Sequence, residues 1–213
     1  LKLKTKEESN KPRIIENLRE QIAIDNNHLS TGFVGTPFML TLLNEEGLGD
    51  LAWEIATQES DPSWYDMIYN KNNSVFKENW QGGLVQMPSL AGPIGAWFYR
   101  SLGGIRAESP GFKSVIIQPY TNTLEWVNTT YESSYGTIES NWQKKDDVLT
   151  MNVVIPANTT ATVYVPGENV TESGMSAENS EGVDFNKYEN GYNVFRLKAG
   201  EYSFISSIEK LTE

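Results

Sequence analysis

The period of the apolar residues changes once along the chain, near residues 105–111, and this change constrains the fold most. Before it, apolar side chains recur at helical spacing, as in residues 11–24, where one face is apolar and the other charged. From Pro110 onward, apolar and polar residues alternate, as in half-buried strands. A run of helices followed by a run of strands is typical of α+β chains with successive units. We therefore predict a helical unit over 1–107 and an antiparallel β-sandwich over 108–213.

The helical unit should consist of short helices separated by Gly, Pro and Asn turns. Pro12 suits the first turn of the first helix, and Asp50 is predicted to cap a third. The Gly103-Gly104 pair should close the last helix. The helices are expected over 11–24, 38–43, a segment starting at Asp50, and 94–102.

The second unit should contain about seven short strands joined by hairpin-like turns, the pattern of an antiparallel sandwich. A polar stretch, residues 168–184, is predicted to be a long surface loop. The strands are expected over 113–118, 124–131, 136–142, 148–155, 160–165, 192–197 and 202–205.

Charge and composition exclude several classes of function. The net charge of −11 disfavours nucleic acid and anionic membrane surfaces, which both require basic faces. The chain has no cysteine and one histidine, so thiol nucleophiles, thiolate metal sites and His-based triads are disfavoured. Carboxylates are left as the candidates for acid–base chemistry, and we expect neither a cofactor nor a metal. The chain opens with Leu1 and lacks an initiating Met, so we expect it to begin inside a larger protein.

The stretch 73–100 concentrates reactive and aromatic side chains where the helices give way to the strands. It contains Glu78, Trp80, Trp97 and a Gly-Gly turn. From the residues alone, Glu78 is either a catalytic carboxylate or a surface or capping glutamate. Trp97 and Trp53 lie on apolar helical faces and are expected in the core.

Seven collinear segments resemble the C-terminal portion of bacterial α-L-rhamnosidases of glycoside hydrolase family 78. The resemblance extends from about Ile14 to Val165. The segments are HLSTGFVGTPF, DPSWYDMI, FKENWQGG, GPIGAWFYRSLGGIR, ESPGFKSVIIQP, YESSYGTIESNW and IPANTTATVYVP.

The resemblance implies that residues 1–107 are the last helices of an incomplete catalytic (α/α)6 barrel, followed by the C-terminal sandwich. It also implies an inverting glycosidase that removes terminal L-rhamnose from glycosides or polysaccharides, with a general acid and a general base. Glu78 matches the family's general-base position. Trp80 and Trp64 match aromatic positions expected to face the sugar. The general acid lies upstream of the matching segments, so the isolated chain should be inactive and should need the missing N-terminal part of its barrel.

One segment departs from the family pattern. Many relatives carry an Asn-His pair after the Gly-containing turn, whereas this chain reads VQMPS over 85–89. Two explanations remain open: Gln86 holds the sugar, or the sugar specificity is altered. His28 follows the first helix and is a further candidate substrate contact, although a lone histidine there is more often structural. Asp61 and Asp66 are turn acids next to the candidate site: either could assist there, but solvated caps are the default expectation.

A second class of function remains open from the residues. The chain could be a non-catalytic carbohydrate-binding or structural module, in which the sandwich contacts sugars and the helices support it. Aromatic side chains gathered around Glu78 would favour the enzyme, and aromatic side chains on an exposed sheet face would favour the binding module.

Overall fold

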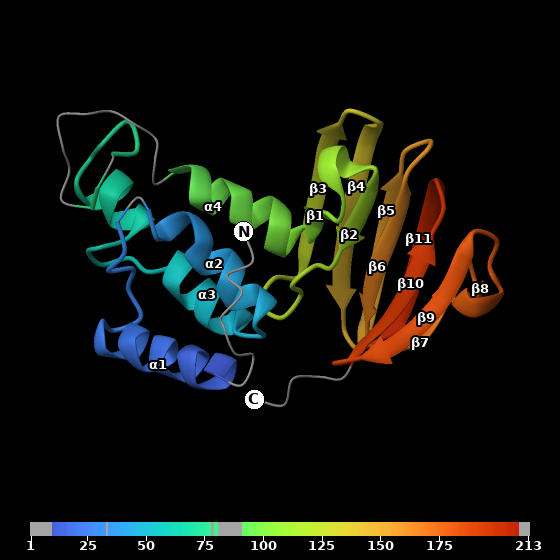
Figure 1. Ribbon diagram of the computed structural model, residues 1–213, viewed down its shortest axis with the longest axis horizontal. Coiled ribbons are helices and arrows are strands. Elements are labelled where there is room, and N and C mark those ends of the chain that lie inside the picture. Colours follow the sequence, from blue (N-terminus) through green and yellow to red (C-terminus); the bar gives the residue numbers. More distant parts are fainter. Residues whose placement is uncertain (1–9, 33, 78, 81–90, 209–213) are drawn as a thin grey trace. The chain divides into compact units, whose positions relative to one another are not determined.

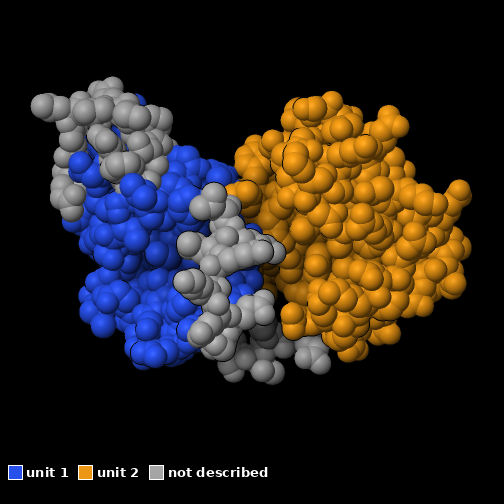
Figure 2. All heavy atoms as spheres, in the orientation of Figure 1, with its two compact units in different colours: residues 1–97 blue, residues 98–213 orange. Residues whose placement is uncertain are grey.

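The computed structural model describes residues 10–32, 34–77, 79–80 and 91–208 (Figure 1). The chain divides into two compact units, residues 1–97 and residues 98–213 (Figure 2). The first unit is helical and the second is built of strands, so the predicted order of helices and then strands is confirmed. The domain boundary after residue 107 stays a prediction.

The helical unit contains four α-helices and one π-helical turn in its described part. The predicted helix over 11–24 is confirmed, with proline in its first turn. It ends at Ile24, and Asn26 and Asn27 follow with φ angles of 52° and 56°, left-handed values that asparagine adopts more readily than most residues. The elements are α1 (Lys11–Ile24), α2 (Thr36–Glu45), α3 (Gly49–Ala56), η2 (Asp66–Asn70) and α4 (Ala91–Trp97).

Helices α2 and α3 follow one another and pack together as a helical hairpin. Buried side chains on them include Leu43, Ala52 and Ile55. Trp97 is also buried, as expected, and its indole Nε1 donates a hydrogen bond to Asn44 Oδ1 at 2.5 Å. Asp50 is not the capping residue that we predicted. Helix α3 begins at Gly49, so Asp50 lies in its first turn. A carboxylate there still interacts favourably with the positive end of the helix dipole.

The second unit is a sandwich of two sheets preceded by a π-helical turn, η3 (Phe98–Leu102). One sheet has the order β1-β2-β6-β10-β9 and the other has the order β3-β4-β5-β11-β7-β8. The strands are β1 (Ile105–Ala107), β2 (Ser114–Ile117), β3 (Trp126–Ser133), β4 (Gly136–Lys145), β5 (Val148–Ile155), β6 (Thr160–Pro166), β7 (Glu168–Glu172), β8 (Met175–Ser176), β9 (Val183–Glu189), β10 (Tyr192–Leu197) and β11 (Gly200–Ser207).

Alternate residues of both sheets point inward and form one apolar core, which includes Trp142, Phe195 and Phe204. Among the described strands every pairing is antiparallel except that of β2 with β6. This parallel pair follows from the path of the chain. After β2 the chain builds three strands of the other sheet and then returns as β6, which is the long crossover that parallel neighbours require.

The prediction of a loop over 168–184 is wrong. This stretch contains β7, β8, the 3-10 turn η5 (Ala177–Asn179) and the start of β9. Its polarity has a structural reason, because the first two residues of β7 and both residues of β8, the last strand of its sheet, are exposed. Polar and charged side chains are common on edge strands, where they discourage pairing with other chains.

None of the helices in the described ranges combines the length and the apolar character needed to cross a bilayer.

Candidate active site

Two indole rings in the helical unit hold together segments that are distant in sequence. Trp64 and Trp80 lie edge to face, with ring centroids 5.4 Å apart and an interplanar angle of 82°. Trp80 Nε1 donates a hydrogen bond to the carbonyl oxygen of Thr31 at 2.9 Å. The two rings are 5% and 6% exposed, so packing is their main contact in this chain. Direct contact with a sugar, which we predicted for both rings, stays a prediction.

Lys71 is the centre of a charged network beside these rings. Its Nζ forms ion pairs with the carboxylates of Asp61 and Asp66, the latter at 2.8 Å. The same Nζ donates a hydrogen bond to the carbonyl oxygen of Trp80 at 3.0 Å. One ammonium group therefore joins the turn after α3, the π-helical turn η2 and the backbone two residues beyond Glu78.

Asp66 differs from the solvated turn acid that we predicted, because it is buried. Its backbone N–H donates to Ser63 Oγ at 2.9 Å, and its Oδ1 accepts a hydrogen bond from Asn70 Nδ2 at 3.0 Å. The hydrogen bond from Lys71 lowers the pKa of the Asp66 carboxyl, against the opposing effect of burial. Burial works against the charge of Lys71 as well, but its hydrogen bonds to Asp61 and Asp66 outweigh it and raise the pKa of Lys71.

We did not predict this network from the sequence, although the spacing of Asp66 and Lys71 suits it. Asp66 and Lys71 are five residues apart, and η2 is a π-helical turn in which the backbone N–H of Lys71 donates to the carbonyl oxygen of Asp66 at 2.9 Å. A turn with i→i+5 hydrogen bonds brings residues of that spacing together, and such turns are frequent at functional sites.

His28 is half-buried, and both of its ring nitrogens are engaged within the helical unit. Nδ1 lies 2.8 Å from the carbonyl oxygen of Asn26, and Nε2 lies 2.8 Å from Ser60 Oγ. A carbonyl oxygen only accepts, so Nδ1 carries the proton. These contacts tie the end of α1 to the turn after α3, and a substrate contact by His28 stays a prediction.

Glu78 and Gln86, the other two predicted site residues, lie outside the described residues. The described neighbours of Glu78 are held to η2: the backbone N–H of Lys77 donates to Met67 Sδ at 3.2 Å, and Trp80 is held by Lys71. Within the described part of the chain, no three His, Asp or Glu side chains come together as a metal site requires.

The described part of the chain is a helical unit, in which Trp64, Trp80 and the Lys71 network join distant segments, followed by a β-sandwich. Two family models match the chain in this order. Residues 1–102 match the bacterial α-L-rhamnosidase 6 hairpin glycosidase domain, and residues 104–180 match the bacterial α-L-rhamnosidase C-terminal domain. The chain belongs to the bacterial α-L-rhamnosidase family and corresponds to the C-terminal part of its members.

Curated relatives support this assignment. An α-L-rhamnosidase from Formosa agariphila is 32% identical over 203 residues, which covers 90% of this chain and 21% of the relative. One from Alteromonas sp. is 31% identical and one from Streptomyces avermitilis is 29% identical, each over 83% of this chain. The matches cover 20% and 18% of those two relatives. The chain thus spans about a fifth of the length of the relatives that it matches.

Solved structures share the fold. The α-L-rhamnosidase of Streptomyces avermitilis, complexed with L-rhamnose, aligns with a TM-score of 0.78 at 28% identity, over 90% of this chain and 19% of that one. The enzyme from Dictyoglumus thermophilum aligns with a TM-score of 0.80 at 28% identity, over 91% of this chain and 23% of that one. The predicted fold class is therefore confirmed.

Proposed function

We propose that this chain is part of an inverting α-L-rhamnosidase that removes terminal L-rhamnose from glycosides or polysaccharides. The observation that carries the proposal is the collinear match of two α-L-rhamnosidase domains, a glycosidase domain and a C-terminal domain, over 1–102 and 104–180. The relatives named above carry the same activity in their names.

In the proposed mechanism, Glu78 is the general base. Its carboxylate takes a proton from a water molecule, whose oxygen forms a bond to the anomeric carbon on the face opposite the leaving group. The glycosidic C–O bond breaks, and a carboxylic acid donates its proton to the departing oxygen. We assign this acid to the barrel segment upstream of residue 1. The chain therefore depends on the rest of its barrel for turnover.

The contacts around Trp80 support the role of Glu78. A general base must be held close to the atom from which it takes a proton. Lys71, bound to the backbone of Trp80, and the indole rings of Trp64 and Trp80 provide a rigid support next to the base in sequence. In the proposal, Trp64 and Trp80, which are 5% and 6% exposed in this chain, lie at the border of the sugar site. Gln86 takes the place of the Asn-His pair of many relatives. His28 is a further candidate contact.

Hydrolysis of p-nitrophenyl α-L-rhamnoside by the full-length parent protein tests the proposal. We expect release of p-nitrophenol by the parent and none by the 213-residue chain alone. Glu78→Gln in the parent should lower kcat by a factor of about 10² to 10⁴, the usual contribution of a positioned general base. Glu20→Gln, on the exposed face of α1, is the matched control and should leave kcat unchanged.

NMR spectra of the first product formed should show the anomer opposite to that of the substrate. Turnover by Glu78→Gln at the parent's rate would remove Glu78 from the mechanism. Cleavage of other p-nitrophenyl glycosides, with the rhamnoside left intact, would show that the sugar specificity has changed where the relatives' histidine is absent.

A further inference from the structure

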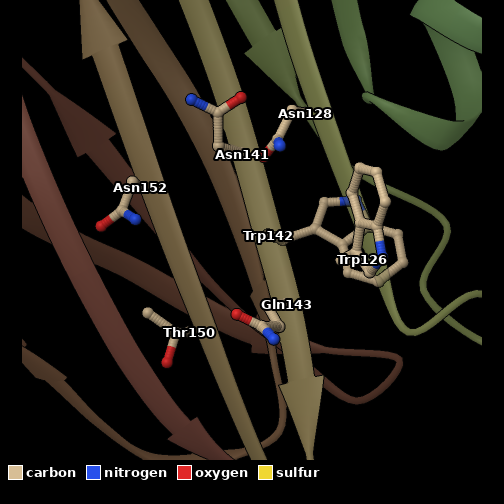
Figure 3. Close-up of a pocket in the computed structure, with 7 residues that line it drawn as sticks. All are labelled: Trp126, Asn128, Asn141, Trp142, Gln143, Thr150 and Asn152. Atoms are coloured by element: carbon tan, nitrogen blue, oxygen red, sulfur yellow. The ribbon is translucent and has the colours of Figure 1, made fainter.

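The outer face of the six-stranded sheet carries a hollow of about 330 Å³ (Figure 3). Its volume is at the small end of the range of ligand pockets, roughly 300–1,000 Å³. The labelled side chains come from three neighbouring strands, β3, β4 and β5. The lining residues are Trp126, Asn128, Asn141, Trp142, Gln143, Thr150 and Asn152.

The strand register explains why these residues share one face. Trp126 pairs with Gln143, which pairs with Thr150. In the adjacent row, Asn128 pairs with Asn141, which pairs with Asn152. Residues two apart on a strand point to the same side, so the two rows form a grid of six side chains on the outer face. Trp142 has the opposite orientation, and its indole is buried in the core.

Trp126 presents an apolar ring to solvent at one corner of this grid, with 59% of its surface exposed. Single exposed apolar residues are common on protein surfaces and carry no meaning alone. Here, however, every other outward position of the grid is an amide or a hydroxyl. A protein partner would require a wider apolar patch than one indole ring, so the surface does not resemble a protein interface.

Three amides of the grid are available for a ligand. In the described part of the chain, the side chains of Asn128, Gln143 and Asn152 have no hydrogen-bond partner, and all three are exposed. Asn141 differs, because it accepts a hydrogen bond from the backbone N–H of Thr129 and donates one to Glu139 Oε2. Each free amide offers both donors and an acceptor, as the hydroxyl groups of a sugar do, and none of the six side chains is charged.

We propose that this grid is a binding site for a neutral saccharide. A pyranose ring would stack on the exposed indole of Trp126, and its hydroxyl groups would exchange hydrogen bonds with Asn128, Gln143 and Asn152. An aromatic ring combined with a few placed polar groups is the usual composition of such sites. This site belongs to the sandwich and does not depend on hydrolysis by the helical unit.

The test is a ¹⁵N NMR titration of the full chain with methyl α-L-rhamnopyranoside, methyl β-D-glucopyranoside and methyl β-D-galactopyranoside. With at least one of them, the indole signal of Trp126 and the side-chain amide signals of Asn128, Gln143 and Asn152 should shift together. Trp126→Ala should raise the Kd at least about tenfold, and Asn152→Ala should raise it by a smaller factor. Both residues are exposed, so neither change should unfold the sandwich.

Tyr188→Ala is the matched control, because Tyr188 is 55% exposed but lies on β9 of the other sheet. Its Kd should equal that of the unchanged chain. The proposal is overturned if none of the three glycosides shifts these signals, or if Trp126→Ala binds with the same Kd. It is also overturned if Trp126→Ala alters only the self-association of the chain in sedimentation, since the surface would then be a contact between copies. The expected saccharide binding does not depend on the proposed hydrolysis, so it should be observed even if the parent protein lacks rhamnosidase activity.

Discussion

Lys71 joins three segments of the helical unit through one ammonium group, which contacts Asp61, Asp66 and the carbonyl oxygen of Trp80. Its partner Asp66 is buried, so the loss of Lys71 would leave a carboxylate out of water with fewer hydrogen bonds. Leaving a buried charged group without its partner costs more than the pair itself contributes.

We therefore expect Lys71→Ala to lower the free energy of unfolding by about 1–3 kcal/mol. Lys187→Ala is the control, because Lys187 pairs with Glu189 on an exposed edge strand, where water and salt screen the pair and its loss should change stability little. Urea unfolding followed by circular dichroism measures both. Equal losses for the two variants would show that the Lys71 network does not stabilise the fold.

The same network predicts a dependence of stability on pH. The folded-state pKa of Asp66 lies below its ordinary value of 3.8, so the unfolded chain takes up the proton first as the pH falls. The stabilisation is complete above the unfolded pKa and is lost as the pH falls through the folded pKa. Unfolding midpoints in urea measured from pH 6 to pH 2 should therefore fall less steeply for Asp66→Asn than for the unchanged chain. Parallel curves would contradict this assignment.

At the scale of elements, the turn that connects η3 to β1 depends on glycine. Gly104 has a φ of 74°, and a Cβ added there would collide with the backbone of Gln118 and Pro119. We predicted Gly103-Gly104 as the end of the last helix. Gly104 also lets the chain pass close to the end of β2 before it enters the sheet as β1.

Gly104→Ala should destabilise the sandwich by more than about 1–3 kcal/mol, because backbone strain adds to a collision with main-chain atoms that cannot move aside. Gly111→Ala provides the comparison. Its φ of 75° is the same within a degree, but nothing lies within 4 Å of the added Cβ, so only the strain remains. Thermal unfolding followed by circular dichroism should give Gly104→Ala the lower Tm. A higher Tm for Gly104→Ala than for Gly111→Ala would be incompatible with the close approach.

At the scale of the whole molecule, the helical unit exposes large apolar side chains. Ile24, Val34, Phe38 and Tyr69 are each at least 60% exposed. The chain covers about a fifth of the length of the relatives that it matches. Such surface in water favours association.

The 213-residue chain should therefore self-associate at micromolar concentration in sedimentation velocity. The double variant Ile24→Ser and Phe38→Ser should shift the distribution toward monomer. Phe185→Ser, on the edge strand β9 of the sandwich, is the control and should leave the distribution unchanged. A monomeric unchanged chain at all concentrations would contradict the expectation.

Much of the architecture followed from local pattern. The first helix, the α2–α3 hairpin, and the order of helices and strands depend on apolar period, on proline at helix starts, and on asparagine and glycine at helix ends. These signals act over a few residues, so they can be read directly along the chain. The sequence does not reveal the strands within 168–184, because β7 and β8 are short and lack the alternating buried positions that produce the period of two.

The amino-acid sequence by itself determined the family and the order of the two units, because both depend on residue identity and order. Only the tertiary structure decided that Lys71 joins Asp61, Asp66 and the backbone of Trp80, and that Trp126 shares a face with the free amides of β4 and β5. Both groupings depend on contacts between separate segments. A π-helical turn and a strand register bring those residues together, and neither leaves a periodic signal in the sequence.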